Sequence, residues 1–138
     1  MMITVKTFID VPKEKAWEFW TLPEHIVKWN HPSEDWHTVA VENDLRIGGK
    51  FKYVMKTKDE SQGFDFEGVY TDVKIFSLIE YKLSDNRTGS IHFNENNDSV
   101  MLIEMFEPEG AIPENIQRQW CQAVIDNFKS YVEADENN

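Results

Sequence analysis

The stretch from Pro113 to Val132 constrains the fold most, because its apolar residues recur at helical spacing. On a helical wheel these residues cover more than half of the cylinder: Ile116, Trp120, Cys121, Ala123, Val124, Ile125, Phe128, Tyr131 and Val132. A helix on a flat surface needs a narrower apolar side, so we predict a helix held in a concave partner. About 20 residues at 1.5 Å each give a rod of about 30 Å. The opposite side is polar and carries Arg118, Gln122, Asp126, Lys129 and Glu133.

Two polar residues, Gln117 and Asn127, interrupt the apolar side of this helix. A buried polar group needs a hydrogen-bond partner or a hydrated cavity. Asn127 lies between Ile116 and Trp120 on the wheel, so we expect its side chain to face the sheet, and we expect Trp120 to be buried there. The Asn127 amide then either bonds to a tyrosine or a strand carbonyl, or lines a cavity. We predict the second arrangement.

The rest of the chain predicts an α+β fold. Ile3 to Asp10 alternates like a strand, and two short helices follow, from Pro12 to Trp20 and from Glu24 to Trp29. Alternating segments joined by short turns then predict antiparallel strands over Thr38 to Val41, Lys50 to Lys58, Phe64 to Phe76, Leu78 to Leu83, Ser90 to Asn94 and Val100 to Phe106. We therefore predict a curved antiparallel sheet wrapped around the long C-terminal helix, with two short helices after the first strand.

Composition and charge narrow the functional classes. The 138 residues argue for one domain over residues 1–138, and an aromatic content of 13% predicts a bulky core or a lined cavity. The net charge of −11 argues against nucleic acid and anionic membranes as partners, because phosphate binding needs a basic face. The single cysteine, Cys121, excludes an internal disulfide and fits a reducing compartment. The N-terminus does not resemble a signal peptide, so we expect a cytoplasmic protein.

The chain contains a series of segments that resembles one known family: VPKEKAWEFWTLPEHIVKWN, ENDLRIGGKF, GFDFEGVYTDV, IEYKL and IQRQWCQAVIDNFKSYVE, in this order. Together they resemble the Hsp90-ATPase-activator-homologue (AHSA1-like) family of the START-like, or Bet v 1-like, helix-grip superfamily. The resemblance covers essentially the whole chain. It implies the helix-grip fold, with a pocket between the final helix and the sheet in many relatives. It implies function less closely, because the superfamily holds lipid carriers, hormone receptors, polyketide cyclases and co-chaperones.

Inward-facing residues of the predicted sheet and final helix form the candidate ligand-binding site. Aromatic side chains would supply contact area, and a few polar groups would orient a ligand. The candidate residues are Tyr53, Met55, Phe66, Tyr81, Glu104, Trp120 and Asn127. The alternative is that the aromatic residues fill a tight core and that Glu104 reaches solvent at a strand end. Trp29 and Trp36 flank a polar loop and are the predicted lid over the open end of the fold.

The sequence offers less for catalysis or metal binding. Glu104 shares strand phase with Leu102, so burial would raise its pKa, and a cyclase would use such a carboxylate with a tyrosine to move protons. No Ser or Cys lies in a recognisable nucleophile elbow or triad setting. His25, His31 and His37 surround an acidic loop, but nothing in their spacing makes them converge. We therefore predict no metal site and no cofactor.

The last predicted strand is apolar on both sides, since Met101, Ile103 and Met105 alternate with its inward-facing residues. The outer face of such a sheet normally meets water, so these three residues would form a homodimer contact or a partner surface. The alternative is that another segment of the chain covers them.

These observations lead to three functional hypotheses. The first is a cytoplasmic binding module, without catalysis, that holds a small hydrophobic molecule between the C-terminal helix and the sheet. The second is a chaperone-associated protein-interaction domain that acts through its outer surface. The third is a polyketide-cyclase-like enzyme in which Glu104 moves protons.

Overall fold

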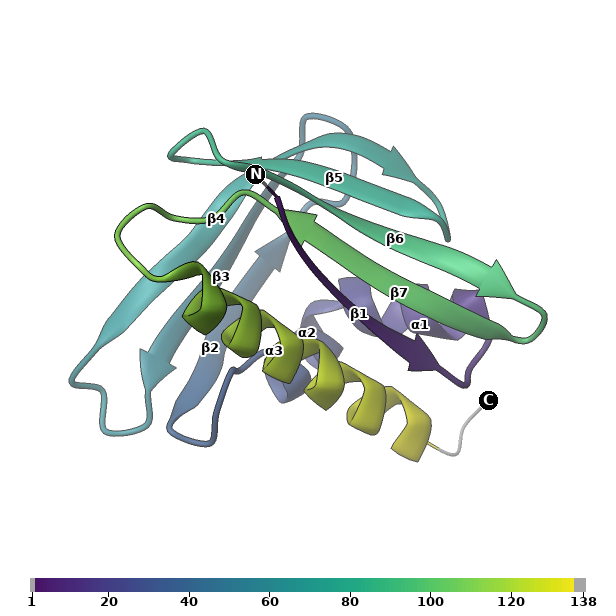
Figure 1. Cartoon of the computed structure of the whole chain (residues 1–138), viewed down its shortest axis with the longest axis horizontal. Coiled ribbons are helices and arrows are strands. Elements are labelled where there is room, and N and C mark those ends of the chain that lie inside the picture. The colour runs from purple at the N-terminus through teal and green to yellow at the C-terminus, as the bar shows by residue number, and fades with distance from the viewer. Residues whose placement is uncertain (1, 136–138) are drawn as a thin grey trace.

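The computed structural model describes residues 2–135, which form one curled antiparallel sheet and three helices (Figure 1). The strands are β1 (Ile3–Ile9), β2 (Trp36–Asn43), β3 (Lys50–Thr57), β4 (Gly63–Lys74), β5 (Leu78–Leu83), β6 (Thr88–Asn96) and β7 (Ser99–Phe106). The helices are α1 (Lys13–Thr21), α2 (Pro23–Trp29) and α3 (Glu114–Ala134). The predicted fold class is confirmed. β2 and β6 are each two residues longer at both ends than the predicted strands over Thr38 to Val41 and Ser90 to Asn94.

The strand order explains why two helices follow the first strand. Neighbouring strands pair antiparallel in the order β1-β7-β6-β5-β4-β3-β2, so β1 and β2 form opposite edges of the sheet. The connection between them must cross the sheet, and α1 and α2 make this crossing on the concave side (Figure 1). Trp17 and Trp20 of α1 pack there against Phe93 of β6, with ring centroids 5.2 and 6.2 Å apart.

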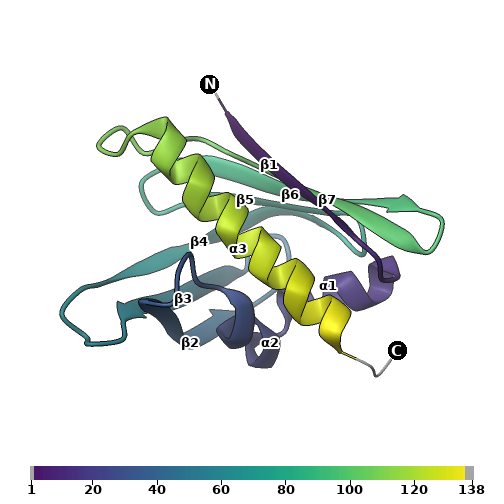
Figure 2. The same ribbon diagram turned by 60° about the horizontal axis from the view of Figure 1, so that its bottom comes forward.

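The long helix α3 lies beside the free edge of β1 and passes over α1 and α2 (Figure 2). Its polar side covers this edge. Three of its side chains donate hydrogen bonds to β1 carbonyl oxygens: Arg118 to Thr4 (3.1 Å), Gln122 to Lys6 (3.0 Å) and Lys129 to Phe8 (2.6 Å). An uncovered edge strand can template aggregation, so the polar side of α3 protects the sheet. No helix within residues 2–135 is both long and apolar enough to cross a lipid bilayer.

The C-terminal half of α3 packs into a continuous aromatic core. The Phe128 ring is fully buried, and its centroid lies 4.9 Å from those of both Trp20 and Trp29. The two tryptophans stack on each other at 4.6 Å. Ile125 and Val132, on the same side of the helix, are also fully buried. This half of α3 therefore holds the helix to α1 and α2, while the preceding half borders a cavity.

The convex face of the sheet carries Met101, Ile103 and Met105, each half-buried. Their cross-strand neighbours are Thr4, Lys6 and Phe8 on β1 and Ser90, His92 and Asn94 on β6. Phe8 is 43% exposed and extends the apolar row by one residue. The apolar patch is thus a narrow row between mostly polar side chains, and its role as a dimer contact stays a prediction.

Candidate functional site

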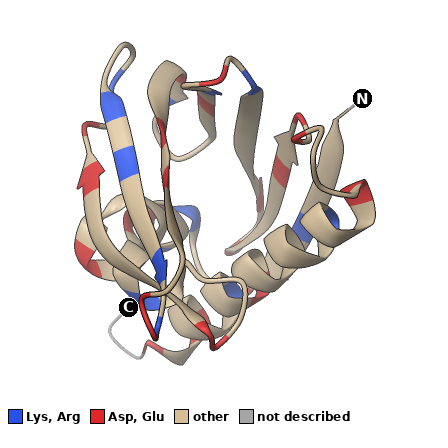
Figure 3. Ribbon diagram, turned by 90° about the vertical axis from the view of Figure 1, so that its left-hand side faces the viewer, with Lys and Arg blue, Asp and Glu red and all other residues tan. Residues whose placement is uncertain are grey.

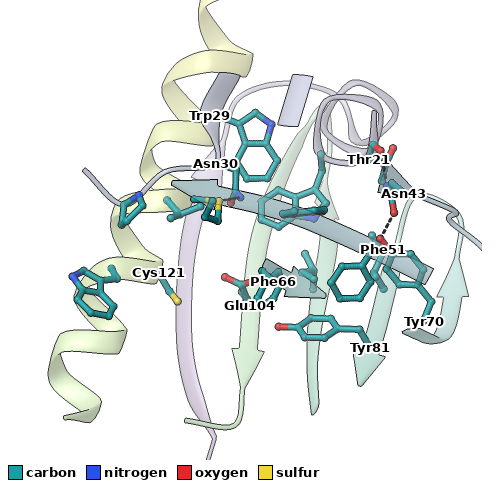
Figure 4. A pocket seen from close by; sticks show the side chains of 18 of the residues that line it. Thr21, Trp29, Asn30, Asn43, Phe51, Phe66, Tyr70, Tyr81, Glu104 and Cys121 are labelled. Carbon is teal, nitrogen blue, oxygen red and sulfur yellow. Dashed lines mark hydrogen bonds between the residues drawn. The ribbon is translucent and has the colours of Figure 1, made fainter. Parts of the chain in front are cut away.

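A cavity of about 220 Å³ lies between α3 and the concave face of the sheet (Figure 4). Its wall comes from strands β2 to β7, from α1, α2 and α3, and from the loop after α2. Its surface is mostly apolar, and its aromatic lining residues are Trp20, Trp29, Phe51, Tyr53, Phe64, Phe66, Tyr70, Tyr81 and Trp120. A cavity lined in this way can bury an apolar molecule against flat ring faces.

The structure brings together all of the predicted ligand-binding residues except Asn127. Strand parity accounts for this, because alternate side chains point to the same face of a sheet. The cavity-lining members of the predicted set are Tyr53, Met55, Phe66, Tyr81, Glu104 and Trp120. Glu104 is half-buried and lines the cavity, and its partners across the ladder, Val5 and Ile91, are both buried, so it is not a solvated residue at a strand end.

Glu104 is the polar group that distinguishes this cavity. Its carboxyl group projects into the space between α3 and the sheet, on the side of Tyr81 and Cys121 (Figure 4). Within residues 2–135 it makes no hydrogen bond or ion pair. Burial raises the pKa of the Glu104 carboxyl from its ordinary 4.5 to about 7, because a charged group loses its hydration in an apolar site. Glu104 is therefore close to half ionised at neutral pH.

The titratable groups around Glu104 remain protonated. Burial, and then the charge of Glu104, raise the pKa values of the Tyr53 and Tyr81 hydroxyls and of the Cys121 thiol. Each of these groups stays a neutral hydrogen-bond donor near pH 7. Among the lining residues there is no Lys, Arg, His or Asp in the described chain. Glu104 is thus the one lining side chain there that changes its charge near neutral pH.

Gly89 makes room for Tyr81. The two residues face each other across β5 and β6, and the Tyr81 ring occupies the space that a Cβ atom at position 89 would need. The Tyr81 ring also packs edge-on against Phe66, with centroids 6.0 Å apart. The glycine therefore sets how deeply this tyrosine sits in the wall of the cavity.

A second polar group of residues lies at the end of the cavity near α1, and sequence reasoning missed it. The Tyr70 hydroxyl donates a hydrogen bond to Asn43 Oδ1 (Figure 4), and Asn43 Nδ2 donates to the Thr21 carbonyl oxygen at 2.7 Å. In the sequence, Tyr70 alternates in phase with Phe66 of the same strand, and this alternation is the signal that could have pointed to it. These bonds connect β4, β2 and α1, so the polar side chains of Tyr70 and Asn43 at this end of the cavity have hydrogen-bond partners within the protein.

The lid prediction is wrong for Trp29. This side chain is 1% exposed, and its Nε1 donates a hydrogen bond to the Phe19 carbonyl oxygen at 3.0 Å. It forms a fixed wall of the cavity because α2 packs under α3 rather than projecting as a flap. Trp36 begins β2 and packs against Phe64, with ring centroids 5.6 Å apart. It therefore lies next to the cavity opening without lining the cavity.

The predicted burial of Trp120 is also wrong. Trp120 is 48% exposed and Phe64 is 54% exposed, and both line the cavity. Because both side chains line the cavity and are exposed to solvent, we infer that the cavity opens beside them. Trp120 lies on the apolar side of α3, but at this height the helix borders the cavity instead of packing on the sheet. The helical wheel correctly placed Trp120 on the apolar side of the helix, but it could not show which segment contacts that side.

Asn127 does not face the sheet. Its Nδ2 donates a hydrogen bond to the His31 carbonyl oxygen at 2.7 Å, which ties α3 to the loop after α2. Gln117, the other polar interruption, is buried and bonds to the backbone of Glu109 and Ile112 at 2.8 to 2.9 Å. Both amides are thus structural, because loops as well as the sheet cover the apolar side of α3.

The three histidines near the acidic loop lie in separate surroundings. His25 Nδ1 is 2.8 Å from the Tyr131 hydroxyl, and its ring stacks on Phe19. His37 Nε2 is buried without a hydrogen-bond partner on β2. Over residues 2–135, no three His, Cys, Asp or Glu side chains gather closely enough to hold a metal ion.

Comparison with known proteins places these features in a family. The family described as Activator of Hsp90 ATPase homolog 1-like protein matches residues 10–133. An AHSA1-like protein from Aeromonas hydrophila is 33% identical, over 100% of this chain and 98% of its own, with a TM-score of 0.91. A protein from Cytophaga hutchinsonii is 43% identical, over 95% of this chain and 91% of its own, with a TM-score of 0.83. A comparison with curated proteins finds no match.

A more distant protein from Chromobacterium violaceum, 24% identical over 98% of this chain and 99% of its own, shares the fold with a TM-score of 0.84. The family match extends from the end of β1 to the last turn of α3, so it includes every residue that lines the cavity. The chain belongs to the family of Activator of Hsp90 ATPase homolog 1-like proteins.

Proposed function

We propose that this chain is a cytoplasmic binding module that holds one small hydrophobic molecule between α3 and the sheet. The observation that carries the proposal is the cavity, whose surface is mostly apolar, with many aromatic side chains and little polar area. Sites for small molecules commonly have this composition. The family and the fold suggest a ligand-binding or chaperone-associated module, and the cavity favours the first of these.

The volume of the cavity limits the size of the ligand. An engineered apolar cavity of about 150 Å³ is large enough to bind benzene. The cavity here, at about 220 Å³, is larger by roughly half. A molecule with one or two fused rings, or an apolar chain of similar volume, fits this space.

The same residues offer little for turnover. The raised pKa of the Cys121 thiol keeps it protonated, and a thiol is a much weaker nucleophile than a thiolate. The raised pKa values of Tyr53 and Tyr81 make them poor bases near pH 7. Among the described residues, Glu104 is then the one lining group that could accept or donate a proton near pH 7, and it has no second such group beside it. We therefore propose binding without catalysis.

Isothermal titration with 2-naphthylmethanol tests the proposal. Val124 lines the cavity from α3, so Val124→Trp should fill the site and weaken binding by at least about tenfold. Val39 is 43% exposed on β2 and does not line the cavity, so Val39→Trp is the matched control and should bind like the unmodified protein. Equal affinity in both variants would show that the probe binds elsewhere.

A chaperone-associated role is the second candidate, because the matching family is named for an activator of the Hsp90 ATPase. The convex row of Phe8, Met101, Ile103 and Met105 is the apolar surface that could serve such a partner, or a second copy of the chain. Ile103→Lys should abolish co-purification with Hsp90 if this row is the contact. Retention of the complex would exclude the row as the binding surface.

A further inference from the structure

In the described part of the chain, the cavity has an acidic group in its wall and no basic group to balance it. Its wall holds the Glu104 carboxyl group and no basic side chain within the described chain. The neutral donors nearest to it in the fold, Tyr53 and Tyr81, come from other strands, and Cys121 comes from α3. None of the three is hydrogen-bonded to the carboxyl group in the described residues. A carboxylate left in apolar surroundings without a countercharge is costly.

Two kinds of event relieve this cost. The carboxyl group can take up a proton, or a ligand can bring a positive charge to it. The aromatic rings of Tyr53, Phe66, Tyr81 and Trp120 favour the second event as well, because ring faces attract cations and accept apolar groups.

The charge of the whole chain acts in the same direction. A net charge of −11 raises the concentration of cations near the surface. Figure 3 shows acidic residues distributed over helices, strands and loops rather than confined to one face. An anionic ligand, by contrast, would be repelled by the protein and would then meet Glu104 without any basic residue to balance it.

We propose that the ligand is a hydrophobic amine, whose ring system fills the aromatic part of the cavity and whose ammonium group pairs with the Glu104 carboxylate. The inference rests on the proposed function, because it assumes that the cavity binds a ligand. It adds the chemical class of that ligand and the residue that selects it.

Matched probes test this inference. 2-Naphthylmethylamine and 2-naphthylmethanol have nearly the same shape and differ in the charge of one group. A charge-assisted hydrogen bond is about twice as strong as a neutral one, so the amine should bind at least about tenfold more tightly near pH 7.5. 2-Naphthylacetate, the anionic probe, should bind more weakly than either.

Glu104→Gln removes the charge and keeps the shape of the side chain. In this variant the amine and the alcohol should bind with similar affinity, and the alcohol should bind about as it does to the unmodified protein. Glu80→Gln is the control, since Glu80 lies next to cavity-lining Ile79 on β5 and so points to the opposite face. Glu80→Gln should keep the preference for the amine.

The affinity for the amine should also depend on pH. A proton and the ammonium group compete for the Glu104 carboxylate, whose pKa is about 7. The ionised fraction rises about tenfold between about pH 6 and pH 8, and the affinity for the amine should rise with it. Tyr53, Tyr81 and Cys121 do not titrate in this window, because their pKa values are raised. Glu104→Gln should show a flat profile.

The outcomes separate the two proposals. If the alcohol binds as tightly as the amine and Val124→Trp blocks both, the inference about the amine is overturned and the proposed function stands. If the preference for the amine persists in Glu104→Gln, the assignment of Glu104 is overturned. If none of the three naphthyl probes binds, both proposals fail.

Discussion

Glu104→Gln should stabilise the unliganded protein above neutral pH, because the folded state holds an unpaired carboxylate. The pKa of Glu104 rises from 4.5 to about 7 on folding. A folded-state pKa above the unfolded one means that stability is fully present below about pH 4.5 and is lost as the pH rises through about 7. At about 1.4 kcal/mol for each pKa unit, the total loss well above pH 7 is about 3.5 kcal/mol.

The difference between two pH values isolates the contribution of the charge. Between about pH 5 and pH 8 the unmodified protein should lose about 2.5 kcal/mol through this group, and water entering the cavity would reduce the loss to about 1 kcal/mol. Glu104→Gln lacks the group, so the gap between variant and parent should grow by the same amount over this range. Glu80→Gln provides the baseline for other titrating residues.

Urea unfolding at both pH values measures this gap from the midpoints, provided that the slopes agree. Any constant difference between Glu104→Gln and the parent reflects packing and cancels in the comparison. A gap that stays the same from pH 5 to pH 8 would refute the conclusion that the half-buried Glu104 carboxyl group lacks a partner among the described residues of an apolar cavity. A gap that shrinks would mean that the carboxylate is stabilised in the folded protein.

Four further substitutions test the packing around the site. Phe128→Ala should lower the free energy of unfolding by about 3–5 kcal/mol in urea. Trp120→Ala should lower it by less than about 1.5 kcal/mol, since this side chain is 48% exposed. Equal losses would contradict the conclusion that only the C-terminal half of α3 packs into the core. Asn127→Leu should cost about 1–3 kcal/mol by leaving the His31 carbonyl oxygen unpaired, and a neutral result would mean that water replaces the amide. Gly89→Ala should push the tyrosine opposite into the cavity and weaken binding of 2-naphthylmethanol; unchanged affinity would show that the wall can adjust.

The spacing of apolar residues along the chain was sufficient to predict the helices and strands and most of the residues that line the cavity. Lys50 to Lys58 alternates between lysines and large apolar residues, and in β3 the apolar set does face the concave side. The inward direction of Glu104 followed from its phase with Leu102, which is buried. A strand repeats every two residues, so once the buried face is known, each side chain on it is known too.

The same spacing was not sufficient to predict which segments contact the apolar side of α3. The wheel identified the apolar side that includes Trp120, Phe128 and Asn127, but these residues meet three different environments: the cavity opening, the aromatic core and the His31 backbone. Helical spacing specifies the direction of a side chain from the helix axis. It carries no information on which distant segment lies in that direction.

The existence of the cavity depends on the same long-range arrangement. α3 is held beside the edge of β1 by side chains such as Arg118 and Lys129, and over α1 and α2 by Phe128. Neither anchor presses the Trp120 end of the helix onto the middle of the sheet, so the space above Glu104 stays open. The residues that face this space could be read from the alternation of each strand, whereas the space itself arises from the distance between elements far apart in the chain, and only their packing sets that distance.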